Sequence, residues 1–396
     1  MSPRRLRAAA PDEADGHLWP DAEQRLLLDA ALADGATARD AYREWRARTD
    51  VDAEFGPAVV RLMPLVYRNL TRLGVDDALL GRLKGVYRRA WYETHQVMER
   101  SRPAVEALVA RGMDVLLLKG APLVLAYYRN HALRPMSDLD LCVRPDRATE
   151  AVAALTSLGW RPTAEPDSDR FRFCHALQFV HPAGGELDLH WHVMYEACRP
   201  GLDDALWADA ESLDFGGLAV RQLGPTTLLL HTVLHGVRWN DETPIRWIPD
   251  ALTILRARGD AVDWTRFVEI GRRLAVTHRL GLGLDYLARE FDAAVPGRVP
   301  HALRTTTPSL VERLERTVIL RDTSDVKSRA TGNQWSIVVD LARLVDPVAH
   351  PLHFAASYPH YLRFRAGLGG RRDILPMVAR GVARRLGARH ARTAHA

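Results

Sequence analysis

The sequence predicts an α+β protein in which a small mixed β-sheet is flanked by an N-terminal and a C-terminal helical region. Three observations support this fold class. Apolar residues with helical spacing fill roughly the first hundred residues, an alternation of strand and helix patterns follows, and helical spacing returns beyond Pro225. The single stretch of strand and helix alternation is therefore expected to form the core.

The N-terminal part is expected to begin with a flexible leader, residues 1–18, whose arginines precede no apolar segment of the kind found in secretion signals. A helical region, residues 19–112, then follows from the spacing in AEQRLLLDAAL and in LLGRLKGVYRRAWYETHQVMERSRPAVEALVARG. Gly112 is expected to end its last helix, because glycine readily adopts the left-handed conformation found after helices.

The expected core, residues 113–195, contains short apolar runs and turn residues. DVLLL suits a buried strand, APLVLAYYRN a helix, DLDLCV a second strand and DRATEAVAALTSLGW a second helix. HALQFVHP and GELDLHWHV are predicted to form a hairpin around Ala183-Gly184-Gly185, a sequence able to supply positive φ angles. This hairpin would complete the sheet.

The C-terminal part is predicted to be a helical domain, residues 196–360, followed by an arginine-rich tail, residues 361–396. We interpret the tail as a cationic, solvated helix with a frayed end, and binding to RNA or to an anionic surface is the alternative. Aromatic residues for base stacking are not interleaved with the final arginines, which weakens the case for nucleic acid.

Composition narrows the class of protein. A chain of 396 residues exceeds the usual size of one hydrophobic core, and its net charge of +5 suits an anionic ligand without requiring nucleic acid. No run of 18 apolar residues occurs, and the three cysteines form no CxxC pair. We expect a soluble cytoplasmic protein with no membrane partner and no disulfide framework.

Three aspartates on the predicted strands could form a metal site. In an extended strand, Asp138 and Asp140 would point to one face about 7 Å apart, and Asp188 of GELDLHW could project toward them from a neighbouring strand. Such carboxylates suit a pair of Mg²⁺ or Mn²⁺ ions that stabilise the attacking and leaving oxygens of phosphoryl or nucleotidyl transfer. The alternative is a solvated strand face without function.

An anion site is predicted just upstream. Lys119, Gly120 and Ala121 follow the first strand and open a helix with Pro122 near its first position, where free N–H groups favour negative charge. Gly120 would let the backbone approach a phosphate closely. Lys119 would add a positive charge or extend into solvent.

Four histidines could contribute to the site. His190 and His192 share the strand face of Asp188, where they could bind metal, act as acid or base, or hydrogen-bond the carboxylates. His231 and His235 lie one helical turn apart in LLLHTVLHG, which suits a zinc pair, a cleft wall or satisfied core histidines. The glutamate of an HExxH zinc motif is missing.

The segment RWIPDALTIL has a structural interpretation. Asp250 is suited to cap or charge the start of a helix, and Trp247 is suited to packing. Arg246 could instead contact an acidic substrate.

These motifs together resemble the polymerase-beta-like nucleotidyltransferase superfamily. More narrowly, LLLKGAPLVLAYYRNHALRPMSDLDLCV, then ELDLHWHV and LLLHTVLHG, resemble a bacterial family of uncharacterised nucleotidyltransferases, as do PIRWIPDALTIL and DWTRFVEI. The resemblance spans roughly residues 20 to 300.

The resemblance implies roles for individual residues. Asp138 and Asp140 would bind the metals, Asp188 would bind the catalytic metal or help to deprotonate the acceptor, and Gly120 and Ala121 would face a triphosphate. The superfamily usually has serine where Ala121 stands, and alanine has no hydroxyl to donate. Two residues of the long loop that follows would replace the lost contact, namely Arg134 and Ser137.

The expected function is Mg²⁺-dependent transfer of a nucleoside monophosphate from an NTP to a small-molecule, peptide or protein acceptor, with release of pyrophosphate. A toxin-like transferase acting on tRNA is one alternative, motivated by the arginine-rich tail. A non-catalytic nucleotide-binding module of the same fold is another, motivated by Ala121.

Overall fold

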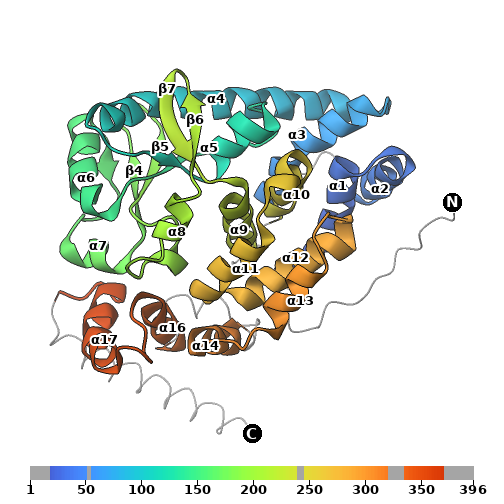
Figure 1. Ribbon diagram of the computed structural model, residues 1–396. Coiled ribbons are helices and arrows are strands. Elements are labelled where there is room, and N and C mark those ends of the chain that lie inside the picture. The colour runs from blue at the N-terminus through green and yellow to red at the C-terminus, as the bar shows by residue number, and fades with distance from the viewer. Residues whose placement is uncertain (1–17, 51–54, 239–244, 320–333, 370–396) are drawn as a thin grey trace, which may run out of the picture. The chain divides into compact units, whose positions relative to one another are not determined.

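The computed structural model describes residues 18–50, 55–238, 245–319 and 334–369 (Figure 1). Its contacts divide the chain into two compact units, one of Met1–Pro166 with Cys174–Pro308 and one of Asp167–Phe173 with Ser309–Ala396. Residues 1–17 of the predicted leader and most of the arginine-rich tail lie outside the described residues. Among the helices within these ranges, none combines the length and the apolar character needed to cross a membrane.

Four helices open the first unit: α1 (Ala22–Leu32), α2 (Gly35–Arg48), α3 (Pro57–Arg72) and α4 (Leu80–Ala110). The start of α1 is fixed by a capping box, in which Asp21 accepts a hydrogen bond from the backbone of Gln24 and Gln24 returns one. After α4, Gly112 has a φ of 70°, the left-handed conformation expected of a residue that ends a helix.

A seven-stranded mixed sheet forms the centre of this unit, in the order β3-β4-β5-β2-β1-β7-β6. Its strands are β1 (Leu116–Leu117), β2 (Leu139–Cys142), β3 (Arg161–Pro162), β4 (Ala176–Val180), β5 (Glu186–His190), β6 (Glu211–Phe215) and β7 (Leu218–Gln222). The pairs β2–β5 and β1–β7 are parallel, and the other neighbours are antiparallel. Helix α4 packs against β2 and β7.

The predicted hairpin forms as β4 and β5, with positive φ angles at Gly184 and Gly185 in its turn. The hairpin β6–β7 was not predicted, although β7 pairs with β1 and carries the sheet past residue 195. Its sequence, ESLDFGGLAVRQ, has the Gly-Gly turn and the alternation that could have identified it. The predicted fold class, a mixed sheet flanked by helices, is confirmed, and the predicted domain limits stay a prediction.

Shorter helices connect the strands. They are α5 (Gly120–Pro122), η2 (Leu123–Tyr128), η3 (Pro145–Arg147), α6 (Ala148–Ser157), η4 (Tyr195–Ala197) and α8 (Asp204–Trp207). The segment η2 is a stretch of wide π-helix that continues α5 and contacts α10. Wide turns of this kind are frequent at functional sites.

The first unit closes with α9 (Pro225–Gly236), α10 (Trp247–Arg258), η5 (Gly259–Ala261), α11 (Trp264–Arg273), α12 (Thr277–Phe291) and α13 (Arg298–Thr305). Helices α9 and α10 pack closely at Gly236. A Cβ added there would lie 1.9 Å from Cγ of Trp247, so only glycine fits at this position. Trp247 is buried here, in agreement with its expected packing role.

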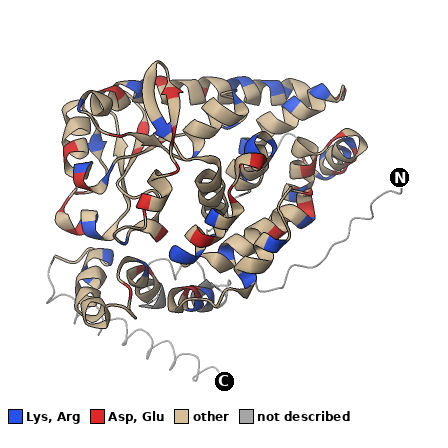
Figure 2. Ribbon diagram, viewed as in Figure 1, with Lys and Arg blue, Asp and Glu red and all other residues tan. Residues whose placement is uncertain are grey.

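The second unit is small and helical. It contains α7 (Ser168–Phe173), α14 (Leu310–Ile319), α16 (Gln334–Leu344) and α17 (Pro351–Arg365). Its core joins Phe173, Leu341 and Tyr361. Figure 2 shows basic and acidic residues along the helices of the described chain, with basic residues the more frequent on α4.

Candidate active site

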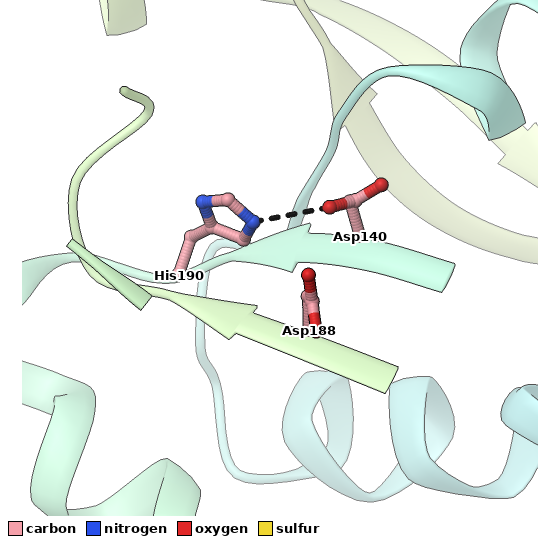
Figure 3. A group of neighbouring side chains, drawn as sticks. All are labelled: Asp140, Asp188 and His190. Carbon is pink, nitrogen blue, oxygen red and sulfur yellow. Dashed lines mark hydrogen bonds and ion pairs between the residues drawn. The ribbon is translucent and has the colours of Figure 1, made fainter. Parts of the chain in front are cut away.

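Asp140 and Asp188 lie opposite each other on neighbouring strands. They are partners in the parallel register of β2 and β5, so their side chains leave the same face of the sheet (Figure 3). His190 stands two residues after Asp188 and therefore shares that face. Ligand atoms of these three residues all lie within 4.8 Å of one another.

Two donors hold the carboxylate of Asp140. Oδ1 forms an ion pair with Nζ of Lys119 and lies 3.1 Å from Nε2 of His190. Burial raises the pKa of Asp140, which is 5% exposed, but the hydrogen bond from His190 and the charge of Lys119 outweigh burial and hold this pKa well below its usual range. Asp140 is therefore ionised at neutral pH.

His190 serves this carboxylate as a donor. An ionised carboxylate can only accept hydrogen bonds, so Nε2 of His190 carries the proton that it shares with Asp140. The other ring nitrogen, Nδ1, is buried without a hydrogen-bond partner. The ring thus orients Asp140 and leaves the carboxylates as the charged ligands of the cluster.

The pKa of Asp188 is shifted in the opposite direction to that of Asp140. Burial raises its pKa, and the neighbouring charge of Asp140 raises it further, against the smaller effects of Lys119 and His190. Its Oδ1 is buried and accepts no hydrogen bond. An unsatisfied buried carboxylate oxygen beside a second carboxylate is costly for the folded chain unless a cation or a proton joins it.

A cleft of about 470 Å³ opens beside this face. Its walls come from α3, the start of α5, the loop before β2, helix α9 and the start of α10. Asp140 and Lys119 line it together with Asp138, Gly120 and Ser137. Two of the predicted acids, Asp138 and Asp140, thus meet Lys119 and Gly120 of the predicted anion-binding turn in one cleft, and Asp188 stands next to Asp140 on β5.

The turn at Lys119 and Gly120 has a constrained backbone. Lys119 has a φ of 50°, which is rare for a residue with a side chain, and α5 begins at the next residue. A Cβ at Gly120 would lie 2.8 Å from Cγ and Sδ of Met136, so the loop before β2 packs directly on this glycine. Ala121 is fully buried.

Asp138 lies outside the strand in which it was expected. Strand β2 begins at Leu139, and Asp138 stands in the loop before it, accepting a 3.3 Å hydrogen bond from Oγ of Ser137. Its carboxylate is not part of the three-residue group formed by Asp140, Asp188 and His190. The expected strand position of Asp138 was wrong, because β2 begins one residue later, although Asp138 and Asp140 still line the same cleft.

Arg134 is occupied by a buried acid. Its Nε lies 2.8 Å from Oδ2 of Asp250, whose Oδ1 accepts a 3.0 Å hydrogen bond from the hydroxyl of Tyr128. Asp250 does stand in the first turn of α10, but its carboxylate binds these two side chains and caps no backbone N–H in the described structure. The network fixes η2 and the loop before β2 to α10.

The four predicted histidines have different partners in the structure. His192 lies past the end of β5, and its Nδ1 is 2.6 Å from Oδ2 of Asp203. His231 and His235 line the cleft from α9. Burial lowers the pKa of His231 to about 3 and that of His235 well below its usual range, so both rings are neutral at pH 7.

Two arginines that the sequence did not place at the site line the cleft: Arg61 was not predicted there, and Arg246 was predicted only as an alternative contact to an acidic substrate. Arg61 of α3 lines it from the N-terminal region, and Arg246 lines it from the residue before α10. The sequence offered no signal for Arg61, because arginines are common in this chain. Their relation to the acids depends on tertiary contacts.

Several solved structures are similar to part of this chain. One is an antigenic nucleotidyltransferase-like protein from Paracoccidioides brasiliensis, with 15% identity and a TM-score of 0.33, covering 55% of this chain and 96% of that chain. Another is the antibiotic-resistance factor ANT(2'')-Ia, with 15% identity and a TM-score of 0.32, covering 50% of this chain and 97% of that one. A complex of ANT(2'')-Ia with adenylyl-2''-tobramycin has 16% identity and a TM-score of 0.31, covering 44% and 97%.

Among curated proteins, no sequence matches this chain. Residues 58–292 match the family described as uncharacterised nucleotidyltransferase. This range is more than half of the chain and contains the whole sheet, the cleft and the group of Asp140, Asp188 and His190. The chain belongs to this family of uncharacterised nucleotidyltransferases.

Proposed function

We propose that this protein transfers a nucleoside monophosphate from an NTP to an acceptor hydroxyl or similar nucleophile, with divalent metal as cofactor, in the manner of the polymerase-beta-like superfamily. The acceptor oxygen would form a bond to the α-phosphorus, and the bond from this phosphorus to the bridging oxygen of the β-phosphate would break, releasing pyrophosphate. One observation carries the proposal. Asp140 and Asp188 stand side by side on parallel strands, and Asp188 has a buried oxygen without a partner.

The residues present fit a divalent cation. Mg²⁺ and Mn²⁺ prefer carboxylate oxygens, and the cluster offers the unpartnered Oδ1 of Asp188 next to the ionised Asp140. Repulsion between the two carboxylates raises the pKa of Asp188, and a bound cation would remove that repulsion. Asp138, at the cleft and close enough to influence the pKa of Asp188, would complete the ligand set.

When bound, the metal would neutralise negative charge on the transferring phosphate and lower the pKa of the acceptor. Residues of the chain would bind the triphosphate, orient the carboxylates and accept the proton of the acceptor. Gly120 would let the triphosphate approach the backbone of the turn, and Ser137 would offer its hydroxyl from the loop before β2. Lys119 and His190 keep Asp140 ionised and oriented. Asp188 would bind metal or receive the acceptor proton.

The direct test supplies each α-³²P-labelled NTP with Mn²⁺ or Mg²⁺ to purified protein, together with a small-molecule extract, a total RNA fraction or a protein extract. We expect label in the small-molecule or protein fraction, dependent on metal and lost in Asp188→Asn. Label in the RNA fraction alone would favour the tRNA alternative. NTP binding without label in any fraction would favour the non-catalytic alternative, which the methyl group of Ala121 motivates.

Separate calorimetry would test the metal site without an acceptor. Titration of each NTP with and without Mg²⁺ should show tighter binding in the presence of metal. Equal metal dependence in the wild type and in a variant with Asp138→Ala and Asp140→Ala would contradict the proposed ligands.

A further inference from the structure

Two arginines of the cleft have no acidic partner among the residues that the structure describes. Arg61 and Arg246 both line it, and in the described ranges no carboxylate forms an ion pair with either guanidinium. The two other cations discussed above are occupied, because Lys119 pairs with Asp140 and Arg134 pairs with Asp250. Arg238 and Asp138 also face the cleft, so lining cations outnumber lining carboxylates, and no ion pair within the described ranges balances the charge of Arg61 or Arg246.

The environment of Arg246 favours a bound anion. Burial, and to a smaller degree the charges of Arg134 and Arg61, lower the pKa of Arg246 to about 9. Asp250 and Asp138 act in the opposite sense but do not pair with it. A partly desolvated cation next to like charges gains free energy when an anion joins it.

Arg246 is also held in place. Its Nη1 donates a 2.6 Å hydrogen bond to the carbonyl of Pro135, which stands two residues before Ser137. Nη1 of Arg134 would lie 3.5 Å from a Cβ at Gly120. Nη1 of Arg134 also donates a 3.3 Å hydrogen bond to the carbonyl of Pro135, so the guanidinium groups of Arg134 and Arg246 meet at this carbonyl, beside the turn at which the triphosphate is expected to bind.

These arginines could supply the phosphate contact that is missing at Ala121, where the superfamily usually has serine. A serine at that position could donate its hydroxyl to phosphate, but Ala121 is buried and has no hydroxyl. Arg134, the substitute expected from the sequence, is occupied by Asp250. Arg61 and Arg246 are the cations in the described part of the cleft that lack a carboxylate partner.

We propose that Arg61 and Arg246 bind the β- and γ-phosphates of the nucleotide and hold the pyrophosphate that leaves. A pyrophosphate group presents charged oxygens on two adjacent phosphorus atoms, which suits two guanidinium groups from different helices, whereas one carboxylate of an acceptor would need one. This inference rests on the proposed function for the identity of the anion.

The test is calorimetric titration of inorganic pyrophosphate into the full-length protein in EDTA, so that no metal contributes to binding. We expect Arg246→Gln and Arg61→Gln each to weaken binding by about tenfold or more, because each removes a charged hydrogen bond. Arg246→Lys should restore part of the affinity, because it keeps the charge and loses the planar donor pair.

The matched control is Arg256→Gln in α10, the helix that Arg246 directly precedes. Arg256 is exposed, and its guanidinium contacts the carbonyl of Leu32 at 3.5 Å, so this variant should bind pyrophosphate as the wild type does. Melting curves of all variants check that the fold is kept. Unchanged pyrophosphate affinity in the double variant Arg61→Gln/Arg246→Gln would overturn the proposal, as would equal weakening in Arg256→Gln.

Failure of this inference is distinguishable from failure of the proposed function. If the protein transfers NMP and the double arginine variant keeps both its KM for NTP and its pyrophosphate affinity, the inference is wrong and the function stands. If pyrophosphate binds through the arginines and no label reaches any acceptor fraction, the function is wrong and the anion site stands.

Discussion

Lys119 forms an ion pair with Asp140 inside the cleft, from a backbone position with a φ of 50°. This pair neutralises one carboxylate of the cluster and leaves Asp188 next to it without a hydrogen bond on Oδ1. Loss of the negative charge should therefore change the stability of the fold in opposite directions at these two acids. Asp140 stabilises the fold as an anion, whereas Asp188 costs stability as an anion until a cation binds.

Asp188→Asn should stabilise the metal-free protein. Because the pKa of Asp188 is raised in the folded chain, the stability that it contributes is present below the unfolded pKa and lost as the pH rises through the folded pKa. At pH 7 in EDTA, the variant should melt about 2 °C higher, since it removes about 1 kcal/mol of repulsion. It should also lose the increase in melting temperature that Mn²⁺ gives the wild type.

Glu186→Gln is the control for this experiment, because Glu186 is exposed, lies on the same strand and points to the same face. It should leave both the melting temperature and the Mn²⁺ response unchanged. Loss of stability in Asp188→Asn with a retained Mn²⁺ response would contradict the assigned role.

Asp140→Asn should destabilise the protein by about 2–3 kcal/mol at pH 7, because it leaves Lys119 partly buried without its counter-ion. The pKa of Asp140 is lowered in the folded chain, so its stabilisation is present above the unfolded pKa and lost as the pH falls. Urea titrations in EDTA should show the difference from wild type shrinking below about pH 4.

The exposed Asp146, just after the same strand, provides the comparison for this substitution. Asp146→Asn should match wild type at every pH. A variant Asp140→Asn as stable as wild type at pH 7 would mean that the ion pair with Lys119 contributes nothing to folding.

Gly236→Ala should disrupt the contact between α9 and α10. The added Cβ would lie 1.9 Å from Cγ of Trp247, so the helices must separate, and we expect a loss of about 3 kcal/mol in the free energy of unfolding. Arg246 precedes Trp247, so pyrophosphate affinity should fall as well.

Gly85→Ala in α4 is the opposite case, because a Cβ there would meet nothing within 4 Å. The change should stabilise the protein by about 0.5–1 kcal/mol, as expected for replacing glycine inside a helix. Equal effects of the two substitutions would contradict the close packing at Gly236.

His231→Gln should reduce the sensitivity of the fold to acid. Burial lowers the pKa of His231 to about 3, so the unfolded chain takes up a proton at higher pH than the folded one. Its contribution to stability is therefore full above the unfolded pKa and lost as the pH falls from about 6.5. Urea midpoints from pH 7 to 4 should fall less steeply in the variant.

The exposed His301 of α13 serves as the reference. His301→Gln should keep the wild-type slope. Identical slopes for His231→Gln and wild type would show that this ring is charged in the folded protein.

Local chemistry let the sequence predict several elements. Asp21 and Gln24 favour a capped helix start, Gly112 favours a helix end, and Gly184-Gly185 favours a hairpin turn, because each acts within a few residues. The same holds for Asp140 and Asp188, whose apolar neighbours fix them in strands. The sequence alone therefore predicted the fold class and two acids of the candidate site.

Tertiary structure decided what depends on distant partners. Arg134 was expected at phosphate, but a buried acid from another helix, Asp250, binds it. His192 shares an alternation with Asp188, yet the strand ends first and Asp203 takes the ring.

The cleft shows the same division. Sequence pattern determined that Lys119 and Asp140 would stand near an anion-binding turn, because a strand and a helix start are local features. The pairing of β1 with β2 brings Lys119 to Asp140. Only the packing of α3 and α10 decided that Arg61 and Arg246 line the cleft without a carboxylate partner in the described part of the chain. Ion pairs between helices far apart in the chain leave no period or motif in the sequence, since charge and distance set them.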